Sequence, residues 1–302
     1  MTLGYQGRLY ILAFDHRGSF KKMFGVGEDA TPDQMARLQD AKRLVWDGVR
    51  HALDNGAPQE SVGVLVDEEM GSEVAREAKA LGVSLAMPVE ASGKPVFDFE
   101  YGDEFGQHIE AFDPEFSKVL VRWNPADSAA DKAVQGERLK KLGDWLHAND
   151  RKYLFELLVP ASPDQAALVG GSGEAYDTEL RPHLTLGAIQ EILDAGVEPD
   201  IWKIEGLDRP RSCELLADLI KRDGRDGVVA VVLGRGADDA KVDHWLRTGA
   251  PVQGYTGFAI GRSIWSAEVA AWNEGSTDRD TAAAAIGSNF KRFIDVYEGG
   301  AN

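Results

Sequence analysis

The sequence predicts an α/β fold of the (β/α)8 type, the TIM barrel, and three observations carry this prediction. Eight short apolar or β-branched runs recur along the 302 residues. Segments with helical periodicity separate most of these runs, which is the order expected of parallel βα units. No Pro- or Ser-rich linker divides the chain, so we expect a single domain over residues 1–302.

The eight predicted strands are short and are bounded by turn residues. They cover residues 8–15, 62–67, 84–90, 118–124, 152–159, 200–206, 227–234 and 254–261. An open doubly wound sheet, the main rival architecture, usually has fewer strands and a Gly-rich first turn. The segment FDHRGSF after the first strand lacks the G-x-G-x-x-G pattern, so the barrel is favoured.

The connecting helices are indicated by their caps and periodicity. The clearest covers residues 31–56, with Thr31 as N-cap, Pro32 at the first helical position and Gly56 at its end. We expect residues 92–117, after the third strand, to be irregular with one short helix. Residues 159–180, after the fifth strand, form a long Gly-rich loop of the kind that covers active sites.

Net charge and composition limit the kinds of molecule that the protein is expected to bind. The net charge of −17 opposes binding to nucleic acid or to anionic membranes, although a few local arginines suffice for an anionic small substrate. No apolar run approaches the ~20 residues of a membrane span, and no export signal opens the chain. Cys213 has no cysteine partner, so we expect a cytoplasmic protein. The acidic surface and a Trp-rich segment near the C-terminus permit a homo-oligomer without specifying one.

The strand DIWKIEG, residues 200–206, contains a lysine among apolar residues. Strand alternation places Lys203 on one face with Ile201 and Glu205, whereas Trp202 and Ile204 suit packing against the outer helices. Lys203 is therefore expected to point into the barrel. On the neighbouring strands the same alternation groups Glu156 with Leu154 and Leu158, and Arg122 with Leu120 and Asn124.

A lysine inside a barrel either pairs with a carboxylate or loses its proton. An uncharged amine can form an imine with a ketone, and the protonated imine withdraws electrons from an adjacent carbon–carbon bond. Glu156, Asp15 and Asp67 lie where they can transfer protons for such a reaction. The alternative interpretation is a structural ion pair of Lys203 with Glu156 or Glu205, with Asp15 and Asp67 as ordinary capping residues.

The last two strands end in similar fragments, VVLGRGADD and FAIGRSIWS. Each places a Gly-Arg pair at a helix start: Gly234 with Arg235, and Gly261 with Arg262. Glycines allow close approach of the backbone to an anion, and the loops after strands seven and eight are the usual phosphate site of this fold. A phosphorylated substrate is expected, the alternative being two ordinary turns with surface arginines.

Metal chemistry is the third interpretation. The six histidines show neither H-x-H nor H-E-x-x-H spacing, so we expect no metal and no other cofactor. A magnesium ion held by Asp67, Glu68 and Glu69 is the alternative, because hard cations require only oxygen ligands.

The chain resembles a bacterial family of class I aldolase-like barrels. This is the domain often fused behind the sugar kinase of myo-inositol breakdown, and it is more distantly similar to tagatose-1,6-bisphosphate and sulfofructose-phosphate aldolases. The matching stretches are AFDHRGSF, LVDEEMG, KVLVRWNP, YLFELLVP, WKIEG, VLGRGA and GFAIGRSIW, and they span nearly the whole chain.

The resemblance implies cleavage of 2-deoxy-5-keto-gluconate 6-phosphate to dihydroxyacetone phosphate and malonate semialdehyde. In this interpretation Lys203 carries the Schiff base, Glu156 moves protons, Asp15 and Asp67 hold hydroxyls or act as the second acid/base group, and the phosphate is bound by Gly234, Arg235, Gly261 and Arg262. From geometry we add Arg122 or Arg17 for the substrate carboxylate. The alternatives are an aldolase for another phosphoketose or a sulfonated sugar phosphate, and a non-catalytic barrel that binds a sugar phosphate.

Overall fold

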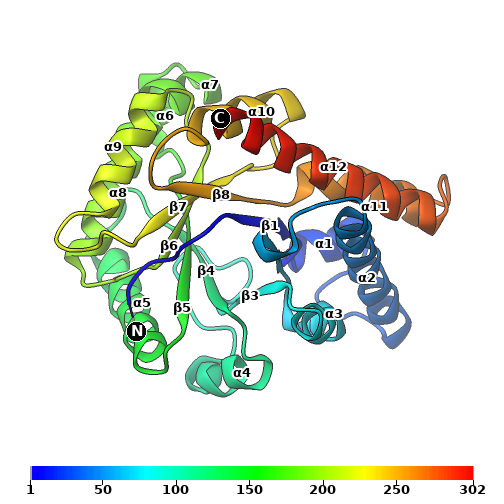
Figure 1. Ribbon diagram of the computed structural model, residues 1–302. Helices are drawn as coiled ribbons and strands as arrows, with labels where there is room; N and C mark the ends of the chain where they lie inside the picture. Colours follow the sequence, from blue (N-terminus) through cyan, green and yellow to red (C-terminus); the bar gives the residue numbers. More distant parts are fainter. Residues whose placement is uncertain (1, 302) are drawn as a thin grey trace.

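The computed structural model describes residues 2–301, and its eight strands form a closed, all-parallel barrel in chain order. Figure 1 shows the barrel with the helices arranged around it. The strands are β1 (Leu9–Ala13), β2 (Val62–Leu65), β3 (Ser84–Pro88), β4 (Phe116–Arg122), β5 (Lys152–Leu158), β6 (Ile201–Glu205), β7 (Val229–Leu233) and β8 (Tyr255–Ile260). The predicted (β/α)8 fold is confirmed, and each strand overlaps its predicted run.

The strands divide the core into two layers. Their inward side chains fill the barrel with a small apolar cluster: Leu9, Ile11, Ala13, Leu65, Ala86, Phe116, Leu154, Ile201, Val229, Val231 and Ala259. Their outward side chains pack with the helices in a second, larger cluster. The ladder pairs Leu120 with Glu156, and Glu156 with Lys203. These positions lie beyond the apolar filling, toward the carboxyl ends of the strands.

Helices lie in every connection between consecutive strands, and two more follow β8. They are α1 (Gly18–Met23), α2 (Pro32–Asp54), α3 (Glu68–Ala80), α4 (Phe105–Phe112), α5 (Ala129–Ala148), α6 (Pro163–Leu168), α7 (Gly173–Ala175), α8 (Arg181–Asp194), α9 (Pro210–Ile220), α10 (Asp239–Gly249), α11 (Arg262–Asn273) and α12 (Arg279–Ala301). Short 3-10 turns cover Gln59–Ser61 and Gly102–Glu104, and a π-helical turn covers Tyr176–Leu180. No helix among residues 2–301 is long and apolar enough to cross a membrane.

Helix α2 begins where the sequence predicts. The Thr31 hydroxyl accepts a hydrogen bond from the Gln34 backbone N–H, and the Gln34 side chain accepts one from the Thr31 N–H. This reciprocal capping box satisfies two N–H groups that a helix start leaves free. Helix α12 lies alongside α2, as Figure 1 shows, and at Gly48 a Cβ atom would overlap Ile286. The chain therefore brings its C-terminal helix against its first long one.

Two connections around the barrel mouth are less regular. Residues 92–117, predicted to be irregular with a short helix, contain a 3-10 turn and α4, and Phe99 forms an isolated antiparallel bridge with Glu90. The connection after β5, predicted as a loop, contains α6, α7 and the π-helical turn. Its first helix begins at a Ser162–Gln165 capping box with Pro163 at the first helical position, which explains why this Gly-rich stretch still forms helix.

Candidate active site

A cavity of about 430 Å³ opens at the carboxyl ends of the strands, where barrels of this type place their active sites. Its lining includes most of the residues predicted from the sequence: Asp15, Arg17, Arg122, Glu156, Lys203, Arg235, Gly261 and Arg262. Two predicted residues, Gly234 and Asp67, are not among the lining residues. The fold thus brings eight of the ten candidate positions to one cavity from distant parts of the chain.

Lys203 projects into the cavity from β6 and is buried. Its Nζ donates a hydrogen bond to Glu156 Oε2 at 2.9 Å, across the β5–β6 ladder that places the two residues side by side. This contact is the Lys203–Glu156 ion pair that the alternative, structural interpretation of Lys203 expects. It also gives the amine the acceptor that it requires before it can act as a nucleophile, because the adjacent carboxylate can receive its proton.

A second lysine, Lys118, lies at the centre of the polar floor. It projects from β4, is 1% exposed, and its Nζ lies 2.8 Å from Asp15 Oδ2, 2.9 Å from Glu90 Oε1 and 3.0 Å from Glu156 Oε2. One oxygen of Glu156 is therefore shared by two ammonium groups, those of Lys118 and Lys203. The three acidic side chains and two lysines form one connected ionic cluster, in which a proton moves only a hydrogen-bond length between neighbours.

The carboxyl groups of the cluster have pKa values shifted in opposite directions. Burial acts to raise the pKa of Asp15 and of Glu156, but the neighbouring charges of Lys118 and Lys203 outweigh it and hold both pKa values below their usual range. Burial prevails at Glu90, whose pKa is raised despite the nearby Lys118. Carboxyl groups with opposed pKa shifts are the arrangement by which one site holds both a base and an acid.

His16 lies beside this cluster and lines the same cavity. Burial lowers its pKa to about 4, although the adjacent Asp15 acts in the opposite direction. Its ring meets Trp265 edge-on at a centroid distance of 5.5 Å. The imidazole is consequently neutral at physiological pH.

The predicted phosphate side is formed by the ends of β7 and β8. A Cβ atom at Gly261 would overlap the Ala13 carbonyl, and one at Gly236, which has φ +73°, would lie 2.9 Å from Arg262 Nη2. Arg262 is exposed at the first position of α11, and no carboxylate pairs with it among residues 2–301. Its guanidinium therefore lies beside the start of α11 with its charge unpaired in the described part of the chain.

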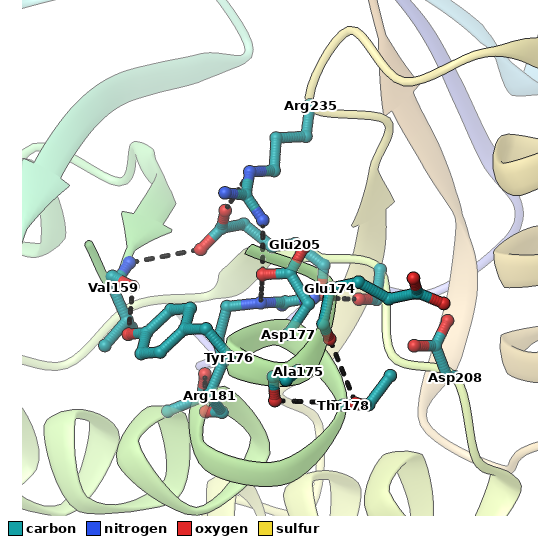
Figure 2. A network of polar contacts seen from close by, with 12 residues as sticks. Val159, Glu174, Ala175, Tyr176, Asp177, Thr178, Arg181, Glu205, Asp208 and Arg235 are labelled. Atoms are coloured by element: carbon teal, nitrogen blue, oxygen red, sulfur yellow. Dashed lines mark hydrogen bonds and ion pairs between the residues drawn. The ribbon is translucent and has the colours of Figure 1, made fainter. Parts of the chain in front are cut away.

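Arg235, the other predicted phosphate residue, is already paired. Figure 2 shows its guanidinium directed at two carboxylates: Nη1 lies 2.6 Å from Asp177 Oδ1, and Nε lies 3.1 Å from Glu205 Oε1. Asp177 comes from the π-helical turn after β5 and also binds the buried Arg181 at 2.9 Å. Arg235 therefore connects the π-helical turn to β6, although no residue of the segment 159–180 lines the cavity. At Gly234, directly after β7, a Cβ atom would lie 3.1 Å from the Ile260 side chain.

The opposite side of the cavity contains the two arginines predicted for the substrate carboxylate, in different states. Arg17 is paired with Glu90 at 3.2 Å and with Glu100 at 3.0 Å. Arg122 is exposed and donates only a 3.3 Å bond to the Lys94 carbonyl, with no carboxylate partner in the described part of the chain. The charge of Arg122 is therefore available to an anionic ligand, whereas that of Arg17 is largely neutralised.

A family model matches residues 4–300, and its description is "Uncharacterized protein conserved in bacteria (DUF2090)". The chain belongs to this DUF2090 family. A comparison with curated proteins found no match to this chain. Among solved structures, this DUF2090 chain is similar to fructose-bisphosphate aldolase from Plasmodium falciparum, crystallised with TRAP and a small-molecule inhibitor. The TM-score is 0.67 at 12% sequence identity, over 98% of this chain and 92% of that one, so the likeness shows a shared fold.

Asp67, predicted from the DUF2090 sequence as a substrate residue, points away from the cavity. It is 1% exposed, accepts a 2.9 Å hydrogen bond from the Met70 N–H at the start of α3, and pairs with Lys42 at 2.8 Å. Its neighbours Glu68 and Glu69 pair with His108 and Lys21. The three acids considered for magnesium therefore have separate partners, and residues 2–301 contain no cluster of three or more metal-ligating side chains.

Sequence reasoning missed Lys118 and Glu90 in the site of this DUF2090 chain. The signal for Lys118 was present, because it shares the face of Leu120 and Arg122 by alternation. Its position at the start of the predicted strand concealed it: β4 begins two residues earlier, at Phe116. Glu90 is one of several polar residues at the ends of the predicted strands, and no local sequence pattern distinguishes it from the others.

Proposed function

We propose that this chain is a class I aldolase that cleaves a phosphorylated keto sugar acid through an imine on Lys203. The observation that carries the proposal is the hydrogen bond from Lys203 to Glu156 inside a cluster that also contains Lys118 and Asp15. A merely structural ion pair needs one partner. Here the amine has an acceptor, a second ammonium and a further carboxylate around one cavity, which are the groups that imine chemistry uses.

The residues divide the steps among them. Glu156 takes the proton of Lys203, whose nitrogen adds to the ketone carbon, and returns protons as the carbinolamine loses water. Asp15, held by Lys118, removes the proton from the hydroxyl of the carbon that leaves as the aldehyde. The carbon–carbon bond then breaks, its electron pair moves toward the iminium nitrogen, and an enamine forms. Protonation at carbon and hydrolysis of the imine release the ketone product and restore Lys203.

The two ends of the cavity suit two anionic groups. On this proposal Arg262 and the start of α11 bind the phosphate, while Arg122 pairs with the carboxylate at the other end. The substrate that fits is 2-deoxy-5-keto-gluconate 6-phosphate, cleaved to dihydroxyacetone phosphate and malonate semialdehyde. A panel that replaces the carboxylate by sulfonate or phosphate at constant chain length would identify the substrate among these classes.

Borohydride trapping tests the proposal. The protein is incubated with dihydroxyacetone phosphate and borohydride, and its peptides are examined by mass spectrometry. We expect a reduced adduct on the Lys203 peptide, none in Lys203→Met, and an unchanged adduct in Lys79→Met, which alters an exposed lysine on α3. Absence of both adduct and turnover in the unmodified protein would leave a non-catalytic binding barrel. Loss of activity with EDTA would favour the metal interpretation.

A further inference from the structure

The chain segment that carries Asp15 is held from outside the barrel by side chains. Strand β1 ends at Ala13, and the carbonyls from there onward accept bonds from helices: that of Ala13 from Trp265 Nε1 at 2.9 Å, and those of Phe14 and His16 from Lys42 Nζ. The contact to His16 measures 2.9 Å. The Lys42 ammonium thus bridges the carbonyls of Phe14 and His16, the residues on either side of Asp15.

Lys42 is completely buried and does not line the cavity. It projects from α2, and its third polar partner is Asp67 Oδ1 at 2.8 Å. The ring of Phe20 lies beneath it, with the centroid 4.3 Å from Nζ. The ammonium donates hydrogen bonds to the two carbonyl oxygens, and the Asp67 carboxylate balances its charge at ion-pair distance. A fully buried charge is tolerated only when it is paired with an opposite charge, and the loss of one partner leaves a costly unpaired group.

We infer that Lys42, oriented by Asp67, is a positioning residue that sets the direction of the Asp15 carboxylate toward Lys118. The inference extends the proposed function and rests on it, since it assigns Asp15 a role in the reaction. Lys42 binds the carbonyls of the residues before and after Asp15, and Asp15 Oδ2 lies 2.8 Å from Lys118 Nζ. Lys42 therefore holds the backbone around Asp15 from outside the barrel, and Lys118 binds the Asp15 carboxylate from inside it.

The ion pair with Lys42 also gives a role to Asp67, which does not line the cavity. One oxygen caps α3 through the Met70 N–H, and the other binds Lys42. The same carboxylate thus couples the start of α3 to the end of β1. A displacement of about 1 Å in a catalytic group costs about 100-fold in rate, so loosening this support should affect kcat even though neither residue meets the substrate.

A double-mutant cycle tests the inference. Lys42→Met should lower kcat by about 10- to 100-fold while leaving the borohydride adduct on Lys203 and the affinity for inorganic phosphate unchanged. In an Asp15→Asn background the same substitution should have no further effect beyond about twofold, the scatter of independent pairs. Combined with Arg262→Ala, on the other side of the cavity, the two losses should multiply.

Asp67→Asn provides a second variant should Lys42→Met fold poorly. Asparagine retains the helix cap but weakens the hold on Lys42, so a smaller loss in kcat is expected, and again none in the Asp15→Asn background. Unchanged kcat in a folded Lys42 variant, or a loss that multiplies with Asp15→Asn, overturns the inference while the unmodified protein stays active. If the unmodified protein gives neither adduct nor turnover, the proposed function itself has failed and the inference falls with it.

Discussion

Replacing Lys118 with methionine should destabilise the folded chain strongly at neutral pH and much less in acid. The side chain is 1% exposed and contacts Asp15, Glu90 and Glu156 at 2.8 to 3.0 Å. Without it, three buried acids share only the charges of Lys203 and Arg17, which leaves one carboxylate unpaired. Breaking a buried ion pair by removing one partner costs about 3–5 kcal/mol, which is the loss of unfolding free energy expected at pH 7.

The direction of the pH dependence follows from the same cluster. Lys118 and Lys203 hold the pKa of Asp15 and of Glu156 below the values near 4 of an unfolded chain, so their contribution to stability is present above about pH 5. That contribution disappears as the pH falls through the folded-state pKa values. The pKa of Lys118 is itself raised, so its contribution persists until the pH exceeds about 10. In the methionine variant the unpaired carboxyl binds a proton in mild acid, which removes most of the cost.

Urea unfolding of both proteins at pH 8, 7, 6 and 5 measures the effect. The difference in unfolding free energy should be greatest at pH 7 to 8 and should decline toward pH 5. Lys79→Met is the matched control, because its partner Asp113 is exposed and such pairs contribute at most about 1 kcal/mol. A difference below about 1 kcal/mol for Lys118→Met at pH 7, or one that is the same at every pH, would refute this account of the cluster.

Three further predictions concern the walls of the cavity. Arg262→Ala should weaken the binding of inorganic phosphate by about 10- to 100-fold, more than Arg235→Ala, because Arg235 is engaged by Asp177 and Glu205; equal losses in calorimetric titrations would contradict this. Arg122→Ala should raise KM for the carboxylate-bearing substrate by about 10-fold but leave trapping of dihydroxyacetone phosphate unchanged, which steady-state kinetics and mass spectrometry can compare. Since the pKa of His16 is about 4, kcat should show no inflection due to this imidazole between pH 5.5 and 8, and an inflection abolished by His16→Asn would disprove its neutrality.

The barrel and the relation between Lys203 and Glu156 could be predicted because both depend on local alternation. A period of two determines which strand residues face inward, and in a closed parallel barrel the inward residues of neighbouring strands meet at one end. The same rule places Lys118 on the inward face, but as the first residue of the predicted strand, whereas β4 begins two residues earlier. Strand boundaries are the part of such a prediction that local pattern specifies least.

The ion pairs that the sequence did not predict join residues distant from each other in the chain. Asp67 looks like a site residue from its place after β2, but the decisive partner is Lys42 on α2, 25 positions earlier. The pairing of Arg235 with Asp177 likewise joins β7 to a turn 58 residues before it. Neither pairing has a local signature, because a buried carboxylate can satisfy its charge with any cation that the packing of helices brings near.

The shared ladder of β4, β5 and β6 has a consequence for how the walls of the cavity can change. Lys118, Glu156 and Lys203 lie on three adjacent strands whose register is fixed by backbone hydrogen bonds, although 38 and 47 residues separate them along the chain. Insertions or deletions in the connecting segments leave that register intact. These three side chains can therefore keep their relative positions while the segment after β3, which lines the cavity, varies in length and composition, so the cavity wall can change without a change in the ionic cluster.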